Sequence, residues 1–163
     1  MKKQLLAVFL GLCAAVMTAR AAELSTVKSL NLAVAKQIAA AAEAEGIKNK
    51  WTLVISIVDA GGNLIYLQRA DNTQIASIDV AVAKAKSAVG FKRPTKAFED
   101  MVAGGRTAVV KLPIAMPIEG GMPLMIGDVC IGAIGVSGAT SAQDGVVAKA
   151  GVDEFVKIAA GSK

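Results

Sequence analysis

Two apolar runs separated by a short glycine-rich turn constrain this fold more than any other feature of the sequence. Trp51 to Val58 is apolar and β-branched, and Leu64 to Arg69 is a second run of the same kind. The residues between them, Asp59 to Asn63, have the sequence Asp-Ala-Gly-Gly-Asn, which is typical of a turn. We therefore expect a β-hairpin, and an antiparallel sheet built on it.

Segments with helical spacing flank this hairpin. Apolar residues recur every three or four positions from Leu24 to Glu45 and from Ile75 to Val89, and a short helix is expected from Lys96 to Ala103. A last helix is expected from Ser141 to about Ala160, because Ser-Ala-Gln-Asp resembles a capping box. The capping residues expected for the first two helices are Ser25 or Thr26 at the start of the first, Gly46 at its end, and Gly90 at the end of the second.

The C-terminal half adds strands but no repeat and no linker. Residues 112–126 contain three prolines and a Gly-Gly pair, so we expect loops there and a short strand at most. Asp128 to Val136 is apolar with small residues and is typical of a buried strand. The order helix, hairpin, helices, strands, helix predicts one α+β domain, an antiparallel sheet flanked by helices.

The first 21 residues have the pattern of a cleaved signal peptide. Lys2 and Lys3 precede 13 apolar residues, and Ala19-Arg20-Ala21 matches a cleavage site before Ala22. The apolar run is shorter than the roughly 20 residues that cross a membrane. We therefore expect a signal peptide over 1–21, one domain over 22–163, a periplasmic or secreted protein, and no membrane association after cleavage. The alternative is an N-terminal core helix.

Charge and composition exclude several classes of function. The full chain carries a net charge of +5, but without residues 1–21 it keeps 15 basic and 13 acidic residues, a charge of +2, which argues against nucleic-acid binding. The absence of histidine excludes Ser-His-Asp catalysis, histidine-ligated zinc and a proximal histidine on haem. Cys130 is the one cysteine beyond the leader, so we expect no internal disulfide and a buried small side chain, with a reactive thiol as the alternative.

Basic residues are the best candidates for ligand contacts. They gather from residue 84 to residue 96, with Arg69 before them, and such a group can hold a carboxylate or a phosphate. The alternative is an ordinary solvated face. The acidic residues form no recognisable catalytic pair, so no catalytic residue is predicted.

Three stretches of the sequence resemble a known family. They are Val58 to Leu64 with Arg69-Ala-Asp71, then Ala83 to Ala88 with Arg93-Pro94-Thr95, and then Gly120 to Leu124 with Ile131 to Gly138 and Gln143-Asp144. Together they are similar to the GlcG/HbpS family, which includes the C-terminal domain of PduO, over roughly residues 24–160. This resemblance implies a five-stranded antiparallel sheet flanked by helices, profilin-like or roadblock-like, and assembly into homo-oligomers. Some members of the family bind haem.

The resemblance also implies site residues. Arg69, Lys84 and Arg93 match motif positions whose side chains could pair with haem propionates, and Thr95 matches a candidate oxygen near the iron. With no histidine, the iron ligand would come from Met, Tyr, Cys, Lys or a Thr oxygen, or the macrocycle would be held loosely. The metal ligand is therefore left open.

The leading interpretation is an exported, non-catalytic protein that binds a small ligand, with haem or another tetrapyrrole as the best candidate. One alternative is an enzyme or accessory factor for a small organic acid, using the same basic residues. The other alternative is an oligomeric scaffold without a ligand.

Overall fold

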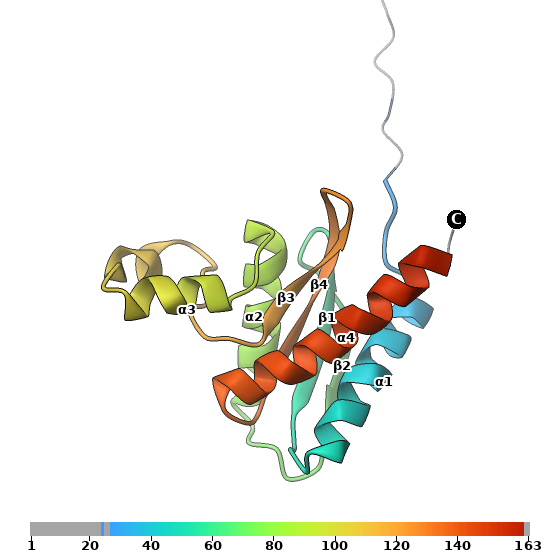
Figure 1. Cartoon of the computed structure of the whole chain (residues 1–163), viewed down its shortest axis with the longest axis horizontal. Helices are drawn as coiled ribbons and strands as arrows, with labels where there is room; N and C mark the ends of the chain where they lie inside the picture. The colour runs from blue at the N-terminus through green and yellow to red at the C-terminus, as the bar shows by residue number, and fades with distance from the viewer. Residues whose placement is uncertain (1–23, 25–26, 162–163) are drawn as a thin grey trace, which may run out of the picture.

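A computed structural model describes Leu24 and residues 27–161 of this chain. Figure 1 shows the arrangement of the elements. They follow in the order α1 (Leu32–Lys48), β1 (Val54–Asp59), β2 (Leu64–Arg69), α2 (Ser77–Phe91), α3 (Lys96–Ala103), the 3-10 helix η1 (Thr107–Lys111), β3 (Gly121–Ile126), β4 (Val129–Ser137) and α4 (Ser141–Gly161).

The strands of the described residues form one antiparallel sheet in the order β2-β1-β4-β3. Val54 of β1 lies opposite Arg69 of β2 on one side and opposite Ser137 of β4 on the other. The expected α+β class is confirmed, but the expectation of five strands is wrong, because this part of the chain supplies four. The stretch between α3 and β3 adds no strand because it forms η1 and a loop with Pro113 and Pro117, which lack the N–H that a ladder needs.

The sheet lies between two layers of helix (Figure 1). α2 packs across β1, β3 and β4 on one face, while α1 covers β1 and β2, and α4 covers β3 and β4, on the other. Side chains alternate accordingly along β1: Ile55 and Ile57 join the core under α1 and α4, and Val58 packs against Ala85 and Val89 of α2.

α2 approaches the sheet so closely that its backbone meets the backbone of β4. A Cβ atom at Gly135 would overlap the carbonyl oxygen of Ala81 and lie 2.6 Å from the nitrogen of Ala85. Beside it, the hydroxyl of Ser56 on β1 donates to the Gly135 carbonyl at 3.2 Å. The fold therefore requires glycine at this position, so that α2 can lie flat on the sheet.

The first two helices begin and end at residues other than those predicted from the sequence. α1 begins eight residues later than expected, because the side chain of Asn31 accepts the Val34 N–H at 2.9 Å and caps the helix. Gly46 lies inside α1, and Gly90 lies inside α2. α2 instead ends at Phe91, and the next residue, Lys92, adopts a left-handed conformation with φ 50°.

A capping box does open α4, but one residue earlier than predicted. The Thr140 hydroxyl accepts the Gln143 N–H at 3.4 Å, and the Gln143 side chain accepts the Thr140 N–H at 3.1 Å. This frees Asp144, which the sequence pattern placed in the box, for a different role.

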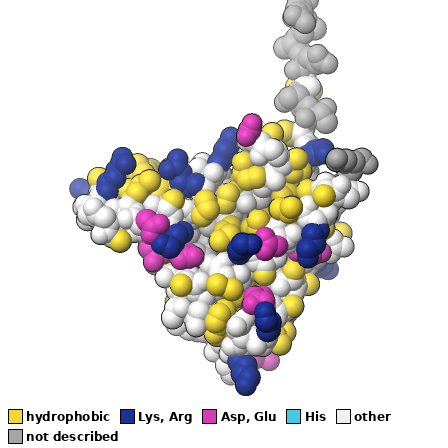
Figure 2. Space-filling view, in the orientation of Figure 1, with side chains coloured by type: hydrophobic (Ala, Val, Ile, Leu, Met, Phe, Trp, Pro, Cys, Tyr) yellow, Lys and Arg dark blue, Asp and Glu magenta, His cyan; other side chains and the backbone are white. Residues whose placement is uncertain are grey.

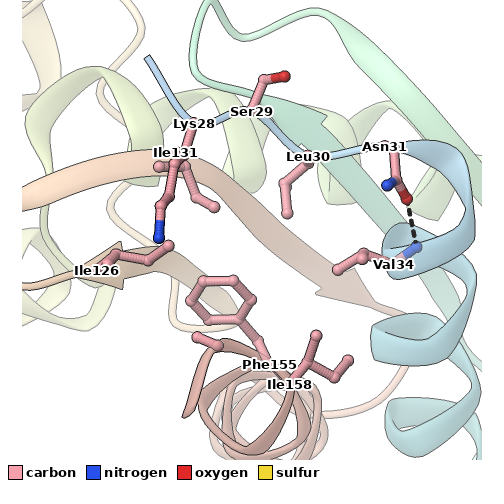
Figure 3. A pocket seen from close by; sticks show the side chains of 10 residues that line it. Lys28, Ser29, Leu30, Asn31, Val34, Ile126, Ile131, Phe155 and Ile158 are labelled. Atoms are coloured by element: carbon pink, nitrogen blue, oxygen red, sulfur yellow. Dashed lines mark hydrogen bonds between the residues drawn. The ribbon is translucent and has the colours of Figure 1, made fainter. Parts of the chain in front are cut away.

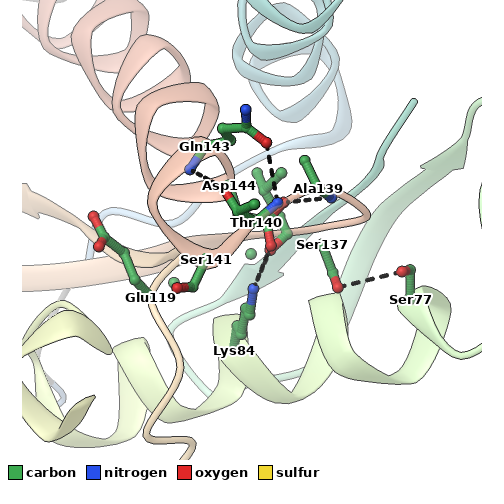
Figure 4. A network of polar contacts seen from close by, with 12 residues as sticks. Ser77, Lys84, Glu119, Ser137, Ala139, Thr140, Ser141, Gln143 and Asp144 are labelled. Carbon is green, nitrogen blue, oxygen red and sulfur yellow. Dashed lines mark hydrogen bonds and ion pairs between the residues drawn. The ribbon is translucent and has the colours of Figure 1, made fainter. Parts of the chain in front are cut away.

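Asp144 forms a buried ion pair with Lys84 that connects α2, β4 and α4 (Figure 4). The Lys84 Nζ lies 2.7 Å from Asp144 Oδ2 and donates to the Val136 carbonyl at 2.9 Å. The other carboxylate oxygen of Asp144 accepts the Ala139 N–H at 3.1 Å. Both side chains are almost fully buried, at 1% and 3% exposure. Burial raises the pKa of the Asp144 carboxyl, and the adjacent Lys84 ammonium pulls that pKa down again.

α3 and η1 form an arm that projects from the sheet (Figure 1). Phe98 of α3 is buried and contacts Phe91 at the end of α2 edge to face, with 4.9 Å between the ring centroids. The rest of the arm exposes apolar side chains, among them Val110, Leu112 and Ile114.

The predicted signal peptide over residues 1–21 and the predicted caps Ser25 and Thr26 lie outside the described residues. Among the residues that are described, no helix is both long and apolar enough to cross a membrane.

We expect Gly135→Ala to destabilise the fold by about 3 kcal/mol or to prevent folding, because neither backbone at the contact can move without shifting α2. Urea unfolding of residues 22–163 measures this loss. The matched control is Gly161→Ala at the end of α4, where an added Cβ has nothing within 4 Å. Equal stability of the two variants would contradict the packing described here.

We expect Asp144→Asn to cost about 3–5 kcal/mol, because it leaves the Lys84 ammonium buried without its counter-ion. Adding Lys84→Met to that variant should recover a large part of the loss, which a double-mutant cycle in urea measures. Asp153→Asn is the control, since its ion pair with Lys149 is exposed and should contribute less than about 1 kcal/mol. Additive single losses would show that the two buried groups are not coupled.

Candidate functional site

Two of the four predicted ligand residues, Lys84 and Thr95, lie together in the interior. Thr95 is fully buried, and its hydroxyl accepts the Gly121 N–H at 2.9 Å. Its own N–H donates to the Gly121 carbonyl at 2.9 Å. Lys84 lies against the same glycine pair, because a Cβ at Gly120 would be 2.9 Å from the Lys84 Nζ. In this structure Thr95 holds the start of β3, and the Lys84 side chain lies beside it but bonds to Val136 of β4 and Asp144 of α4.

The two predicted arginines lie on the surface and apart from each other. Arg69 is the last residue of β2 and pairs with Val54 of β1. Val54 also pairs with Ser137 of β4, which contacts Ser77 in the first turn of α2, so Arg69 lies at the end of the sheet where α2 begins. Arg93 follows the other end of α2, which is 15 residues long, so roughly 20 Å of helix separates the two arginines. The Arg93 guanidinium stacks over the Phe98 ring, 5.6 Å from its centroid. The four predicted residues therefore do not surround one pocket.

A polar cluster that the sequence did not single out lies where the arm meets α4. Glu99 accepts hydrogen bonds from the backbone N–H of Glu119 and from the Ser141 hydroxyl, the latter at 3.2 Å. Figure 2 shows acidic side chains gathered where the arm joins the body. Partial burial raises the pKa of Glu119, Lys96 lowers it, and Glu99 raises it again. In the part of the chain that the structure describes, no His, Cys, Asp or Glu side chains form a group able to hold a metal ion.

A groove of about 270 Å³ opens beside the C-terminal end of α4 (Figure 3). Its walls come from the extended segment before α1, from the first turn of α1, from the β3–β4 hairpin and from α4. The apolar lining residues are Leu30, Val34, Ile126, Ile131, Phe155, Ile158 and Ala159, and the polar ones are Lys28, Ser29 and Asn31.

Lys28 is the charged residue of this groove. Figure 3 shows its side chain directed toward the space between Ile126 and Phe155. A second hollow of about 270 Å³ is lined by Val27, Lys28, Ile126, Val129 and Ile131. The two hollows share Lys28 and two isoleucines of the hairpin, so they adjoin each other and the exposed Lys28 borders both.

Sequence reasoning missed this groove because it placed residues 24–31 in a helix. In the structure residues 27–31 are extended, so Lys28 and Leu30 turn toward the hairpin instead of following a helical face. The signal that could have shown this is Asn31, a good N-cap residue four positions before the buried Ala35.

A third hollow, of about 290 Å³, lies at the opposite end of α2 from Arg69. It is lined by the β1–β2 turn together with Lys86, Val89, Gly90 and Ile114. The turn is held by Asp59, which accepts N–H groups of Gly61 and Asn63 at 2.8 and 2.9 Å. These hydrogen bonds keep the pKa of the Asp59 carboxyl below its usual value.

Cys130 is half-buried, where a fully buried side chain was expected. Its thiol donates to the Gly132 carbonyl at 3.3 Å and packs beside the Val58 and Ala133 cluster under α2.

Comparison with known proteins agrees with the resemblance seen in the sequence. The model of the family described as "Haem degrading protein HbpS-like" matches residues 30–153. The GlcG protein of Escherichia coli K12 is 40% identical over 108 residues, which cover 66% of this chain and 81% of that protein.

Solved structures agree as well. A double mutant of HbpS from Streptomyces reticuli superposes with a TM-score of 0.75 at 30% identity, covering 86% of this chain and 96% of that one. A complex of PduOC with haem superposes with a TM-score of 0.71 at 26% identity, covering 78% and 95%. The order of the elements, the glycine-dependent packing and these matches together place the chain in the HbpS-like family.

Proposed function

We propose that this protein is an exported, non-catalytic binder of a flat apolar ligand that carries carboxylates, with haem or a related tetrapyrrole as the best candidate. The observation that carries the proposal is the apolar groove with the Lys28 side chain directed toward it. The haem complex of the structural neighbour PduOC supports the choice of ligand.

The walls of the groove fit one face of such a ring. Isoleucine side chains of the hairpin and Phe155 of α4 offer apolar surface on two sides. Burial of apolar area contributes about 25 cal/mol per Å² before the costs of binding. The groove is slightly smaller than the roughly 300–1,000 Å³ of most small-ligand sites, and the adjoining hollow extends it.

The charge in the groove fits the edge of the ring. Among the described residues that line it, Lys28 is the one with an ionisable side chain. A propionate entering the groove therefore meets the Lys28 ammonium. An ammonium binds such a group as a point charge, with less geometric demand than arginine.

The nitrogen and oxygen donors of the groove are few. Asn31 already caps α1, which leaves the Lys28 amine and the Ser29 hydroxyl beside the ligand. Haem would supply a redox-active iron when bound, while the apolar walls bury the ring and Lys28 orients its carboxylates. Because these donors are weak iron ligands, burial of the ring supplies most of the affinity.

Export and self-association belong to the same proposal. The cleavage pattern before Ala22 supports a periplasmic or secreted protein. The likeness to HbpS and PduOC structures supports a homo-oligomer. The small net charge of +2 after cleavage argues against a nucleic-acid partner.

A second candidate function is an enzyme or accessory factor for a small organic acid, and Glu119 favours it. Partial burial, together with the charge of nearby Glu99, raises the pKa of the Glu119 carboxyl, which suits a general acid or base. Turnover of a substrate separates this candidate from a binding protein.

We expect Lys28→Glu to weaken haem binding by residues 22–163 about tenfold or more, because it replaces the cation with a charge that repels propionates. Titration with ferric haem, followed at the Soret band, measures this. Lys36→Glu on the exposed surface of α1 is the matched control and should bind as the wild type does. Arg93→Ala tests the site predicted from the sequence. Loss of saturable binding in Arg93→Ala, with Lys28→Glu unchanged, would move the site to the end of α2.

We expect the exported protein to begin at Ala22. N-terminal sequencing of the protein from the periplasm or the medium checks this, and Ala21→Phe should block processing, because the cleavage site requires a small residue. A chain that keeps Met1 and stays inside the cell would instead support an N-terminal helix.

A further inference from the structure

We propose that the free edge of β2 pairs with β2 of a second copy of this chain, so that the two sheets join across a two-fold axis. This inference deepens the proposed homo-oligomer, on which it rests, by naming the surface that joins the copies. Three features support it: the backbone groups of β2 that have no partner strand among the described residues, the position of α2, which leaves β2 largely uncovered, and the presence of both signs of charge at each end of the strand.

The outer side of β2 has unpaired backbone groups. The Ala70 N–H donates to the Leu53 carbonyl at 2.9 Å, so the alternation of an antiparallel ladder directs the N–H and C=O of Gln68 toward β1. The same alternation directs those of Leu67 and Arg69 away from β1. Within the described residues β2 is the last strand on this side of the sheet, so these groups have no strand to pair with.

β2 also lacks the features that protect a free edge. Exposed edge strands are commonly guarded by proline, by lysine or by a short length. β3, the opposite edge, contains Pro123. β2 has six residues, begins Leu-Ile-Tyr-Leu and carries a charge only at its last residue, Arg69. Such a strand is a template for another strand.

The helix layer on the α2 face of the sheet also leaves β2 largely uncovered. α2 covers β1, β3 and β4 but does not pack comparably on β2. Leu64 is 50% exposed, and Leu67 is half-buried on the same face as Arg69. A strand added at this edge would bury these leucines.

A second copy fits this edge better than an unrelated strand, because an antiparallel pair of identical strands has two-fold symmetry. Pairing centred on Leu67 places Leu67 opposite itself and exchanges the two ends of β2. One end carries Arg69 and Asp71, and the other carries Asp59 and Lys86. Each end thus carries one cation and one anion, so the exchange of ends sets no surplus of like charge against itself.

The test is sedimentation velocity of residues 22–163 as a function of concentration. We expect a dimer or a multiple of it, and we expect Leu67→Lys to raise the dimer dissociation constant at least tenfold, because two lysines would then face each other. Circular dichroism checks that this variant is folded. Leu112→Lys, the same change on the exposed arm, is the matched control and should leave the mass unchanged.

A cross-link gives a second, independent readout. In a Cys130→Ser background, Leu67→Cys should form a covalent dimer on mild oxidation, because facing residues of such a pair lie about 5.5 Å apart between Cα atoms. Asp128→Cys in the exposed β3–β4 turn is its control and should not.

Each remaining outcome overturns the proposal. An oligomer that survives Leu67→Lys, or that Leu112→Lys dissociates instead, would assign the interface elsewhere while leaving the homo-oligomer standing. A wild type that is monomeric at all concentrations would overturn both. Haem binding is measured separately in the titration, so its failure would leave this interface unaffected.

Discussion

The ion pair of Lys84 and Asp144 is the interaction on which the arrangement of the helices depends. It joins α2, on one face of the sheet, to the first turn of α4, which covers the other face. The Lys84 ammonium also donates to the Val136 carbonyl near the end of β4. Taking both charges out of water is costly, and a pair of this kind contributes less to net stability than its geometry suggests. We interpret it as a determinant of specificity: alternative packings of two alanine-rich helices would leave one of these charges buried alone.

The glycines around this pair follow from the same constraint. Lys84 reaches Asp144 across the backbone of Gly120 and Gly121. A side chain at Gly120 would clash with the Lys84 ammonium, and a side chain at Gly121 would clash with the Lys84 carbonyl. Gly135 allows α2 to lie close enough for Lys84 to make this reach. The residues that gave the strongest family resemblance are thus packing residues of the interior. Their presence explains why the fold is shared, and it leaves the ligand to be decided by other residues.

Secondary-structure elements could be predicted from the sequence better than contacts between residues far apart along the chain, for physical reasons. α3 and β2 occupy their expected ranges, because a turn or a helix break next to them is a local signal. Gly46 and Gly90 did not end their helices, because tertiary packing overrides the weak preference of glycine. The ion pair of Lys84 was not predicted, because its carboxylate partner lies 60 positions away along the chain and no local pattern indicates it. The groove was missed because it depends on whether five residues before α1 are helical or extended.

The proposed ligand groove and the proposed interface between copies occupy different parts of this architecture. The groove lies under the β3–β4 hairpin and the end of α4, beside the strands at one side of the sheet. The free edge of β2 lies on the other side, with β1 between it and β4, whose Ile131 lines the groove. In the proposed dimer, joining two sheets at β2 would therefore leave both grooves open to solvent, so assembly would not compete with a ligand for surface. The buried ion pair ties the first turn of α4 to α2 and β4 and so helps to fix the position of α4 on the sheet. A change that weakens it would therefore alter the groove through the position of Phe155, whereas the ladder between β1 and β2 contains no residue of the pair.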